Sequence, residues 1–248
     1  MTQLQGKVAL ITGAGQGIGR GIALILARAG ADIVVAEMVA DRIPTVVQEI
    51  EALGRKALGV QMDVTKDAHV REAVKQPLDQ FGRLDVLVNN AGIGWPRKVV
   101  DMTDKEWDLQ INVNLKGTFY CCRAVLPHMI QRQQGAIINI ASVSGWISDP
   151  QRTAYSAAKA GVMAFTRSLA GEVARDGIRV NAIAPGPIHS PLAHMLPESD
   201  RESLRTSVIL KRWGQPEEIG EAVAFLASDA SSYITGETMS VSGGMFMH

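Results

Sequence analysis

The run VALITGAGQGIG, residues 8–19, joins a short apolar segment to a turn that contains four glycines. Apolar residues then recur at helical spacing, at Ile22, Leu26 and Ala29. Glycine lets the backbone turn tightly and approach a ligand closely, and free N–H groups at the start of the following helix attract phosphate. The order strand, turn, helix therefore predicts a dinucleotide site, in preference to a turn that needs glycine for steric reasons alone. Its predicted residues are Gly13, Gln16, Gly17, Ile18 and Gly19.

The same alternation of apolar run and helical stretch continues to residue 241, without a linker, charge block or repeat. Runs that are apolar throughout suit strands that helices cover on both faces. The sequence therefore predicts an α/β fold with a doubly wound parallel sheet, and residues 1–248 are expected to form a single domain. The seven predicted strands are 8–11, 33–36, 57–62, 86–88, 137–140, 180–184 and 239–241.

Length and charge exclude several classes of protein. Of 248 residues, 25 are Lys or Arg and 25 are Asp or Glu, so the clustered positive charge of a nucleic-acid binder is not expected. No apolar run approaches the roughly 20 residues that span a bilayer, and no secretory signal precedes the first strand. We expect a cytoplasmic protein without nucleic-acid or membrane partners.

Cysteine and histidine give no sign of a metal site. Cys121 and Cys122 are adjacent within a helical pattern, which disfavours a mutual disulfide and predicts that they are packing residues. The five histidines lack metal-ligand spacing. No catalytic metal is therefore expected.

An irregular stretch follows the predicted strand 180–184 and has four prolines between residues 185 and 197. Loops of this length in compact domains are commonly functional lids. Ligands of open α/β sheets bind beyond the carboxyl ends of the strands, which is where this stretch begins. Residues from about 186 to 208 are therefore predicted to form a substrate lid.

Glu37 ends the second predicted strand and bears on the choice of cofactor. A carboxylate at this place accepts hydrogen bonds from the adenosine ribose and repels a 2′-phosphate. Gln16 within the glycine turn is neutral, and Arg20 and Arg42 lie outside that turn. The sequence therefore favours NAD over NADP.

Tyr155 and Lys159 are four residues apart in a helical stretch, so their side chains share a face. A phenol with a reference pKa of about 10 is a weak base at neutral pH, but an adjacent ammonium stabilises its phenolate. The pair supplies a proton-transfer group for an alcohol or a carbonyl, and Ser142, just past a predicted strand, is placed to donate to the same oxygen. Taken alone, Tyr-x-x-x-Lys is a weak motif that more often marks an ordinary helix face.

Together these residues resemble the short-chain dehydrogenase/reductase family along essentially the whole chain. The resemblance implies a Rossmann-type sheet, an NAD-binding catalytic domain and a homotetramer. The Tyr-to-Lys spacing also differs from that of the family's enoyl reductases, so the predicted reaction is at C–O and not at C=C. The motifs that carry the resemblance are the glycine turn 12–19, Asp63-Val64, Asn89-Asn90-Ala91-Gly92, Val113-Asn114-Leu115, Ser142, Tyr155 with Lys159, and Pro185-Gly186.

The resemblance also implies roles for these residues. Tyr155 would be the acid/base, and Lys159 would hold the nicotinamide ribose and lower the pKa of Tyr155. Ser142 would position the substrate oxygen, and Asn114 would support a water-mediated proton relay. The cofactor contacts implied in the same way are Asp63 and Val64 on adenine, Asn90, Ala91 and Gly92 on the adenosine side, and Ile188 and Ser190 on the carboxamide.

For the reaction, an NAD-dependent interconversion of a secondary alcohol and a ketone fits best. Segments 224–229 and 233–238 resemble 3-oxoacyl-(acyl carrier protein) reductases, which are the alternative, but Gln16 and Glu37 do not match the NADPH residues of those enzymes. A non-catalytic NAD-binding sensor or scaffold is the alternative of another class. An apolar substrate is expected from Trp95, Trp146, Ile147, Leu192, Met195 and Leu196, whereas His189 and His194 are expected on the lid surface.

Overall fold

The computed structural model describes residues 3–194 and 198–247, and in these residues seven parallel strands form a sheet of order β3-β2-β1-β4-β5-β6-β7. Each predicted strand is found, with ends that differ by at most two residues, so the predicted α/β, Rossmann-type, doubly wound sheet is confirmed. The strands are β1 Val8–Thr12, β2 Asp32–Glu37, β3 Ala57–Gln61, β4 Val86–Asn89, β5 Gly135–Ile140, β6 Ile178–Pro185 and β7 Thr238–Val241.

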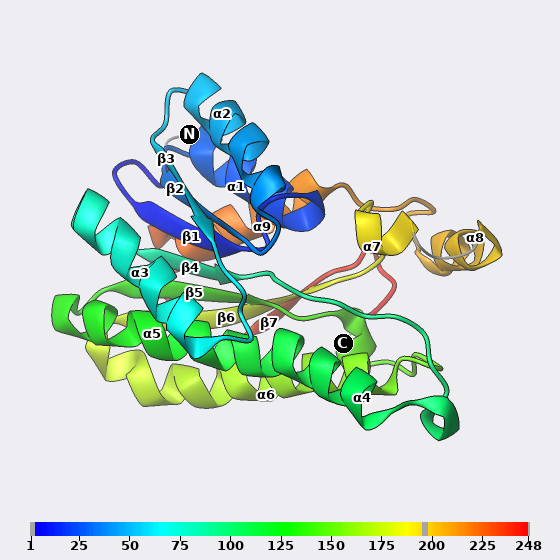
Figure 1. Ribbon diagram of the computed structural model, residues 1–248. Coiled ribbons are helices and arrows are strands. Elements are labelled where there is room, and N and C mark those ends of the chain that lie inside the picture. Colours follow the sequence, from blue (N-terminus) through cyan, green and yellow to red (C-terminus); the bar gives the residue numbers. More distant parts are fainter. Residues whose placement is uncertain (1–2, 195–197, 248) are drawn as a thin grey trace.

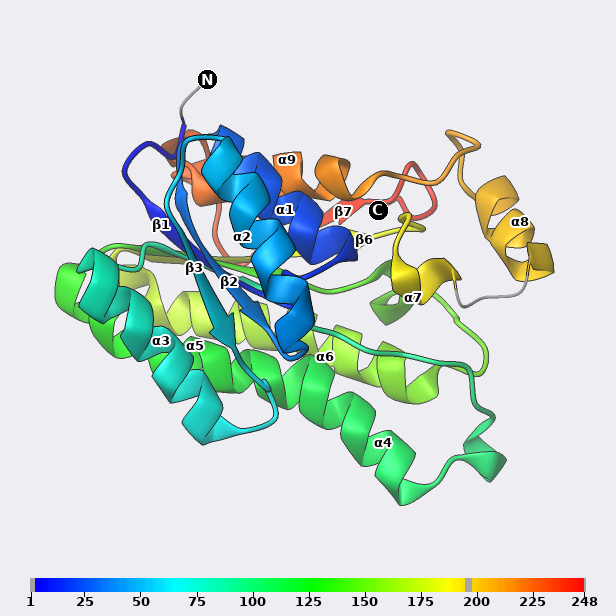
Figure 2. The same ribbon diagram turned by 45° about the horizontal axis from the view of Figure 1, so that its top comes forward.

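Helices cover both faces of the sheet (Figure 1). One layer holds α1 Gly17–Arg28, α2 Ile43–Ala52 and α9 Pro216–Ala227, and the other holds α3 Asp67–Phe81, α5 Gly117–Arg132 and α6 Thr153–Val173. A π-helical turn, Asn112–Lys116, joins α4 Asp104–Ile111 to α5. Two further helices, α7 Pro191–His194 and α8 Glu198–Ser207, stand beyond the end of the sheet (Figure 2).

The apolar strands fold this way because successive side chains point to opposite faces. In β2, Ile33 and Val35 pack in the core under α1 and α9, whereas Val34 and Ala36 pack in the core over α3 and α5. The Cys121-Cys122 pair is buried in the second core as two free thiols, so the predicted packing role is confirmed. Among the described helices, none is long and apolar enough to cross a membrane.

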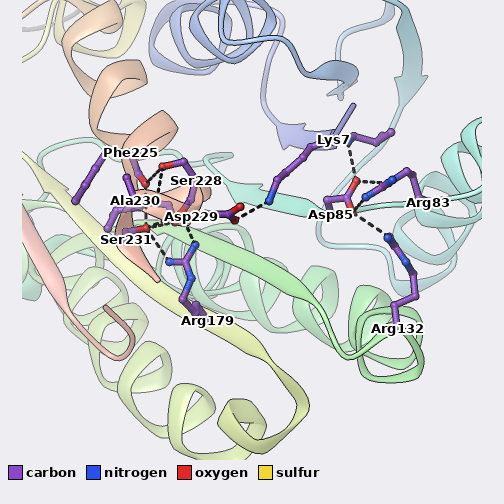
Figure 3. Close-up of polar contacts among 12 residues, drawn as sticks. Lys7, Arg83, Asp85, Arg132, Arg179, Phe225, Ser228, Asp229, Ala230 and Ser231 are labelled. Atoms are coloured by element: carbon purple, nitrogen blue, oxygen red, sulfur yellow. Dashed lines mark hydrogen bonds and ion pairs between the residues drawn. The ribbon is translucent and has the colours of Figure 1, made fainter. Parts of the chain in front are cut away.

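The buried carboxylate of Asp85 links the amino ends of β1 and β4, at the edge of the sheet opposite the carboxyl ends of the strands (Figure 3). Asp85 accepts the backbone N–H of Val8 at 2.9 Å and pairs with Arg83 at 2.7 Å and Arg132 at 3.0 Å. Burial opposes ionisation of Asp85, but these hydrogen bonds outweigh it and lower the pKa of the carboxyl group. The network joins β1, β4 and α5, and leaves the carboxyl edge for the candidate site.

Candidate active site

The glycine turn between β1 and α1 adopts backbone that favours glycine. Gly13 and Gly17 have φ values of +64° and +53°. A Cβ atom at Gly19 would lie 2.2 Å from the carbonyl oxygen of Gly13, so a side chain does not fit there. Gln16 precedes α1, and no side chain of the described residues caps this end of the helix. The N–H groups at the start of α1 are therefore free to bind an anion, and the turn fits the pyrophosphate of a dinucleotide.

Asn90 and Ala91 clamp this turn from the end of β4. Nδ2 of Asn90 donates to the carbonyl oxygens of Thr12 and Gly13 at 2.9 and 3.1 Å. The backbone N–H groups of Asn90 and Ala91 both donate to Oγ1 of Thr12, at 3.0 and 2.9 Å. The Asn90 side chain thus shapes the turn, and Thr12 is a site residue that the sequence reasoning missed. Its only signal was a hydroxyl residue directly before Gly13.

Glu37 lies at the end of β2, against the glycine turn. Its carboxylate accepts the backbone N–H of Gly15 and of Val39, each at 3.1 Å, and the residue is only 6% exposed. Arg42 Nη1 lies 4.0 Å from Glu37 Oε1, whereas Arg20 is tied to Glu49 by two hydrogen bonds of 2.8 and 2.6 Å. A fixed carboxylate therefore stands beside the turn that fits the pyrophosphate.

Asp63 and Val64 follow β3 at the same edge, because β3 pairs with β2 as far as Glu37 opposite Gln61. The Asp63 carboxylate accepts the N–H and Oγ1 of Thr65 at 2.9 and 2.7 Å. Val64 is buried against α5. Of this pair, Asp63 retains a partly exposed polar group that a ligand can reach.

Helix α6 places Tyr155 and Lys159 on one face, with Nζ of Lys159 5.6 Å from the centre of the Tyr155 ring. Lys159 is 4% exposed and donates to the carbonyl oxygen of Ile140 at 2.8 Å. Burial lowers the pKa of Lys159 to about 8. Burial raises the pKa of Tyr155, and the Ser142 hydrogen bond and the Arg152 charge act in the opposite direction. Lys159 is thus desolvated beside a partly exposed Tyr155, and perturbed pKa values of this kind are common among proton-transfer groups of active sites.

Ser142 lies directly beyond β5, in extended backbone, close enough to Tyr155 for its hydroxyl to lower the pKa of the phenol. The Ser142 hydroxyl donates to Ser144 Oγ at 3.2 Å. Ser142 Oγ also accepts the N–H of Ser144 at 3.2 Å, and the Ser144 hydroxyl donates to Asp149 Oδ2 at 2.6 Å. These contacts fix the Ser142 hydroxyl beside the phenol. Ser142 and Tyr155 can therefore bind one substrate oxygen together.

Asn114 lies in the π-helical turn between α4 and α5 and is 1% exposed. The loop after β4 passes between it and α6. A Cβ atom at Gly92 would lie 2.8 Å from Asn114 Oδ1 and 3.4 Å from Lys159 Nζ, and one at Gly94 would lie 2.7 Å from Cδ2 of Tyr155. The loop thus connects Asn114, Lys159 and Tyr155. Gly94 was not predicted as a site residue, because a single glycine after a strand also suits any turn.

The segment after β6 meets the glycine turn. Cβ of Ser190 lies 3.5 Å from where a Cβ atom of Gly17 would stand, and Ser190 Oγ accepts the N–H of Ala193 at 3.3 Å. Ile188 is buried beside Gly214, to which it forms a parallel β-bridge. Ser190 thus lies beside the turn, and the contact of both residues with the carboxamide stays a prediction.

The predicted apolar surroundings are described only in part. Trp146 stacks on Phe246 with ring centres 4.6 Å apart, and Trp95 and Ile147 are partly buried. His189 is exposed and lies 5.6 Å from the ring of Trp213. Met195 and Leu196, and the side chains of Leu192 and His194, are outside the described part of the chain. Within residues 3–194 and 198–247, no three His, Cys, Asp or Glu side chains form a group that could hold a metal ion.

The sheet, the glycine turn and the set Asn114, Ser142, Tyr155 and Lys159 define the class of protein. The chain belongs to the short-chain dehydrogenase/reductase family. A family model described as enoyl-(acyl carrier protein) reductase matches residues 13–246. As a family member, the chain is an oxidoreductase that acts on a CH–OH or ketone group with a nicotinamide dinucleotide cofactor.

Individual relatives are similar over nearly their full length. The 3-oxoacyl-[acyl-carrier-protein] reductase FabG of Thermotoga maritima is 42% identical over 243 residues, which are 98% of this chain and 99% of that protein. The (2S)-[(R)-hydroxy(phenyl)methyl]succinyl-CoA dehydrogenase subunit BbsD of Thauera aromatica is 43% identical over 241 residues, 97% of each chain. A crystal structure of a short-chain type dehydrogenase/reductase from Mycobacterium marinum has a TM-score of 0.95 at 37% identity and covers 100% of this chain and 98% of its own.

Proposed function

We propose that this chain is an NAD-dependent dehydrogenase that interconverts a secondary alcohol and a ketone, with Tyr155 as the acid/base. The observation that carries the proposal is the placing of Tyr155 near Ser142 and Lys159, with the loop after β4 packed against all of Asn114, Lys159 and Tyr155. The family sets the reaction class, and the contacts of this chain support the assignment of roles.

The roles follow from the contacts of each side chain. In the oxidation direction the Ser142 hydroxyl holds the substrate hydroxyl, and the Tyr155 phenolate takes its proton. In the reduction direction the hydroxyls of Ser142 and Tyr155 both donate to the carbonyl oxygen, and Tyr155 gives up its proton. A nicotinamide dinucleotide, when bound by the glycine turn, would provide the acceptor or donor of the hydride. The Lys159 ammonium stabilises the phenolate and binds the nicotinamide ribose, and Asn114 supports the path by which the proton reaches water.

The preference for NAD rests on Glu37. Its carboxylate is fixed by Gly15 and Val39 beside the turn, where the 2′-phosphate of NADP would meet a negative charge. The nearest cation, Arg42, faces that same carboxylate. The remaining proposed cofactor contacts are Gly13, Gln16, Gly17, Ile18, Gly19, Asp63, Val64, Asn90, Ala91, Gly92, Ile188 and Ser190.

A 3-oxoacyl-(acyl carrier protein) reductase is the second candidate, because several relatives that are 42 to 45% identical carry that name. A screen of secondary alcohols, ketones and a 3-oxoacyl carrier-protein thioester, each with NAD(H) and NADP(H), tests both. Turnover of free alcohols with NAD supports the proposal. Turnover of the carrier-bound thioester alone, with NADPH, supports the second candidate.

We further propose that residues 186–208 act as a substrate lid and that the chain assembles as a homotetramer. The lid includes α7 and α8, which stand apart from both helical layers (Figure 2). Tetramer formation is supported by apolar side chains that remain exposed on α4 and α5, including Trp107, Leu109 and Phe119. Sedimentation at micromolar concentration tests the assembly, and a monomer would reject it.

A further inference from the structure

Arg152 is a cation beside the catalytic tyrosine that has no acidic partner in the described part of the chain. Its guanidinium carbon lies 5.7 Å from the centre of the Tyr155 ring, and the residue is partly buried. Within residues 3–194 and 198–247 it forms no ion pair, whereas Arg97 on the neighbouring loop pairs with Glu106. A cation left in this state beside an acid/base group is available to a ligand.

The other charges around the site are already engaged. Arg97, on the neighbouring loop, pairs with Glu106 at 3.0 Å, and the Lys159 ammonium donates to a backbone carbonyl. The Asp149 carboxylate accepts the Ser144 hydroxyl at 2.6 Å, on the side of Ser142. Of the charged groups that act on the Tyr155 phenol, Arg152 has a larger effect than Asp149. Among these charged groups, Arg152 is the one whose side chain has neither an ion pair nor a hydrogen bond within the described residues.

The backbone holds Arg152 in this position. Gln151 adopts a left-handed φ of +67°, and its carbonyl oxygen accepts the N–H of Arg97 at 2.6 Å. Arg152 then directly precedes α6. Its backbone N–H donates to the backbone carbonyl oxygen of Asp149, and its carbonyl oxygen accepts the N–H of Ser156. No side chain of the described residues caps this end of α6, so the free N–H groups of a 21-residue helix add positive potential at the same place.

We propose that Arg152 is a specificity-determining residue that binds a carboxylate of the substrate. The substrate class is then hydroxy acids and the corresponding oxo acids, with the carboxylate one or two carbon atoms from the carbinol. This spacing reaches from the Tyr155 hydroxyl to a guanidinium above the same ring, and the planar guanidinium matches a carboxylate with two parallel hydrogen bonds. Arg152 is a single cation, and the negative charge of Asp149 lies nearby. The position therefore suits a ligand group with one negative charge, such as a carboxylate, better than a phosphate with nearly two. The inference rests on the proposed function and adds an anionic end to its apolar substrate.

The test compares 3-hydroxyhexanoate with its methyl ester, which lacks the charge, on the full chain with NAD. Wild type is expected to have a kcat/KM for the acid roughly 10- to 100-fold above that for the ester. Arg152→Gln is expected to remove this preference by raising the KM for the acid. Its kcat/KM for the ester stays within about threefold of the wild-type value. Arg152→Lys retains part of the preference, because it keeps the charge and loses the planar fork. Arg97→Gln is the matched control, since Arg97 already has a partner, and it is expected to keep the wild-type ratio.

Equal use of acid and ester by wild type, or an equal loss on both in Arg152→Gln, overturns the inference. If wild type turns over neither compound with NAD or NADP, the proposed function fails for this substrate class. The role of Arg152 is then tested by measuring the binding of a carboxylate. Calorimetric titration of hexanoate into the complex with NADH then supports the inference if affinity is lost in Arg152→Gln and kept in Arg97→Gln. Equal affinity of wild type and Arg152→Gln rejects it.

Discussion

Asn114 and Ile93 are hydrogen-bonded to each other in both directions. Nδ2 of Asn114 donates to the carbonyl oxygen of Ile93 at 2.7 Å, and the N–H of Ile93 donates to Oδ1 at 3.2 Å. The second hydrogen of Nδ2 is donated to the carbonyl oxygen of Gln110 at 2.8 Å. Both amide hydrogens are thus in use within the protein. The side chain fastens the loop over the catalytic face, and a water relay at Asn114 can use only its acceptor oxygens.

Asn114→Ala is expected to lower the free energy of unfolding by about 1–3 kcal/mol, because it leaves the Ile93 N–H and two buried carbonyl oxygens without their partner. It also lowers kcat, because the loop no longer holds Gly94 against Tyr155. Urea denaturation and steady-state kinetics measure the two effects. Asn112→Ala, in the same turn, is the control and is expected to change stability by less than about 0.5 kcal/mol. Similar stability of the two variants would contradict the fastening role.

Tyr155→Phe is expected to lower kcat by roughly 10²- to 10⁴-fold, because it removes the proton-transfer hydroxyl and keeps the ring. NADH binding, followed by fluorescence, stays close to that of wild type. Tyr233→Phe, at a fully exposed tyrosine, serves as the control and keeps full activity. A Tyr155→Phe variant with wild-type turnover would refute the assigned chemistry.

Lys159→Met is expected to abolish activity and to stabilise the fold at pH 7. The pKa of Lys159 is about 8 when folded against 10.5 for the free side chain, so burial of its charge destabilises the folded state by as much as about 3 kcal/mol below pH 8. Between about pH 8 and 10.5 the unfolded chain binds more protons than the folded one, and wild-type stability rises relative to the variant. Urea denaturation of both proteins across this range measures the difference. If the difference in free energy of unfolding between the two proteins does not change with pH, burial of the Lys159 charge does not destabilise the fold.

Glu37→Gln is expected to raise kcat/KM for NADP by about tenfold or more relative to NAD, because it removes the negative charge that would face a 2′-phosphate. The amide oxygen can still accept one of the two backbone N–H groups, so the fold is preserved. Initial rates with both cofactors provide the ratio. Glu49→Gln, at the partner of Arg20, is a control outside the turn. An unchanged ratio in Glu37→Gln would remove Glu37 from cofactor selection.

Gly19→Ala is expected to weaken NADH binding by about tenfold or more, because its Cβ atom would stand 2.2 Å from the Gly13 carbonyl oxygen and force the turn open. Gly171→Ala is the matched control. It places a Cβ atom in open space on α6 and is expected to stabilise the helix by up to about 1 kcal/mol. Fluorescence titration compares the two variants, and equal affinity would show that the turn tolerates a side chain.

The fold could be predicted well from the sequence because its strands are short apolar runs bounded by turns. In β2 the same residues that make the run apolar also divide between the two cores, so pattern and structure agree. Strand ends moved by up to two residues, as at Gly135, because pairing with a neighbouring strand extends a strand beyond its apolar part.

The site was predicted less completely, because contacts between distant segments leave little trace in one sequence. The π-helical form of the turn that holds Asn114 has no local signal, and neither has the contact of Gly94 with Tyr155. The clamp from Asn90 onto Thr12 spans 78 residues. Motif order placed Asn90 in the site, but only the structure assigns its side chain to the protein backbone.

That clamp has a consequence for how the enzyme meets its cofactor. Four hydrogen bonds join the backbone and hydroxyl of the first strand's end to Asn90 and Ala91, so the turn takes its shape when the sheet forms. Ordering the loop is then part of folding, and little conformational entropy is lost when the dinucleotide arrives. Affinity for the cofactor should therefore track the integrity of the central strands. On heating, cofactor binding should be lost together with the sheet and not before it, because buried central strands such as β4 open only in global unfolding.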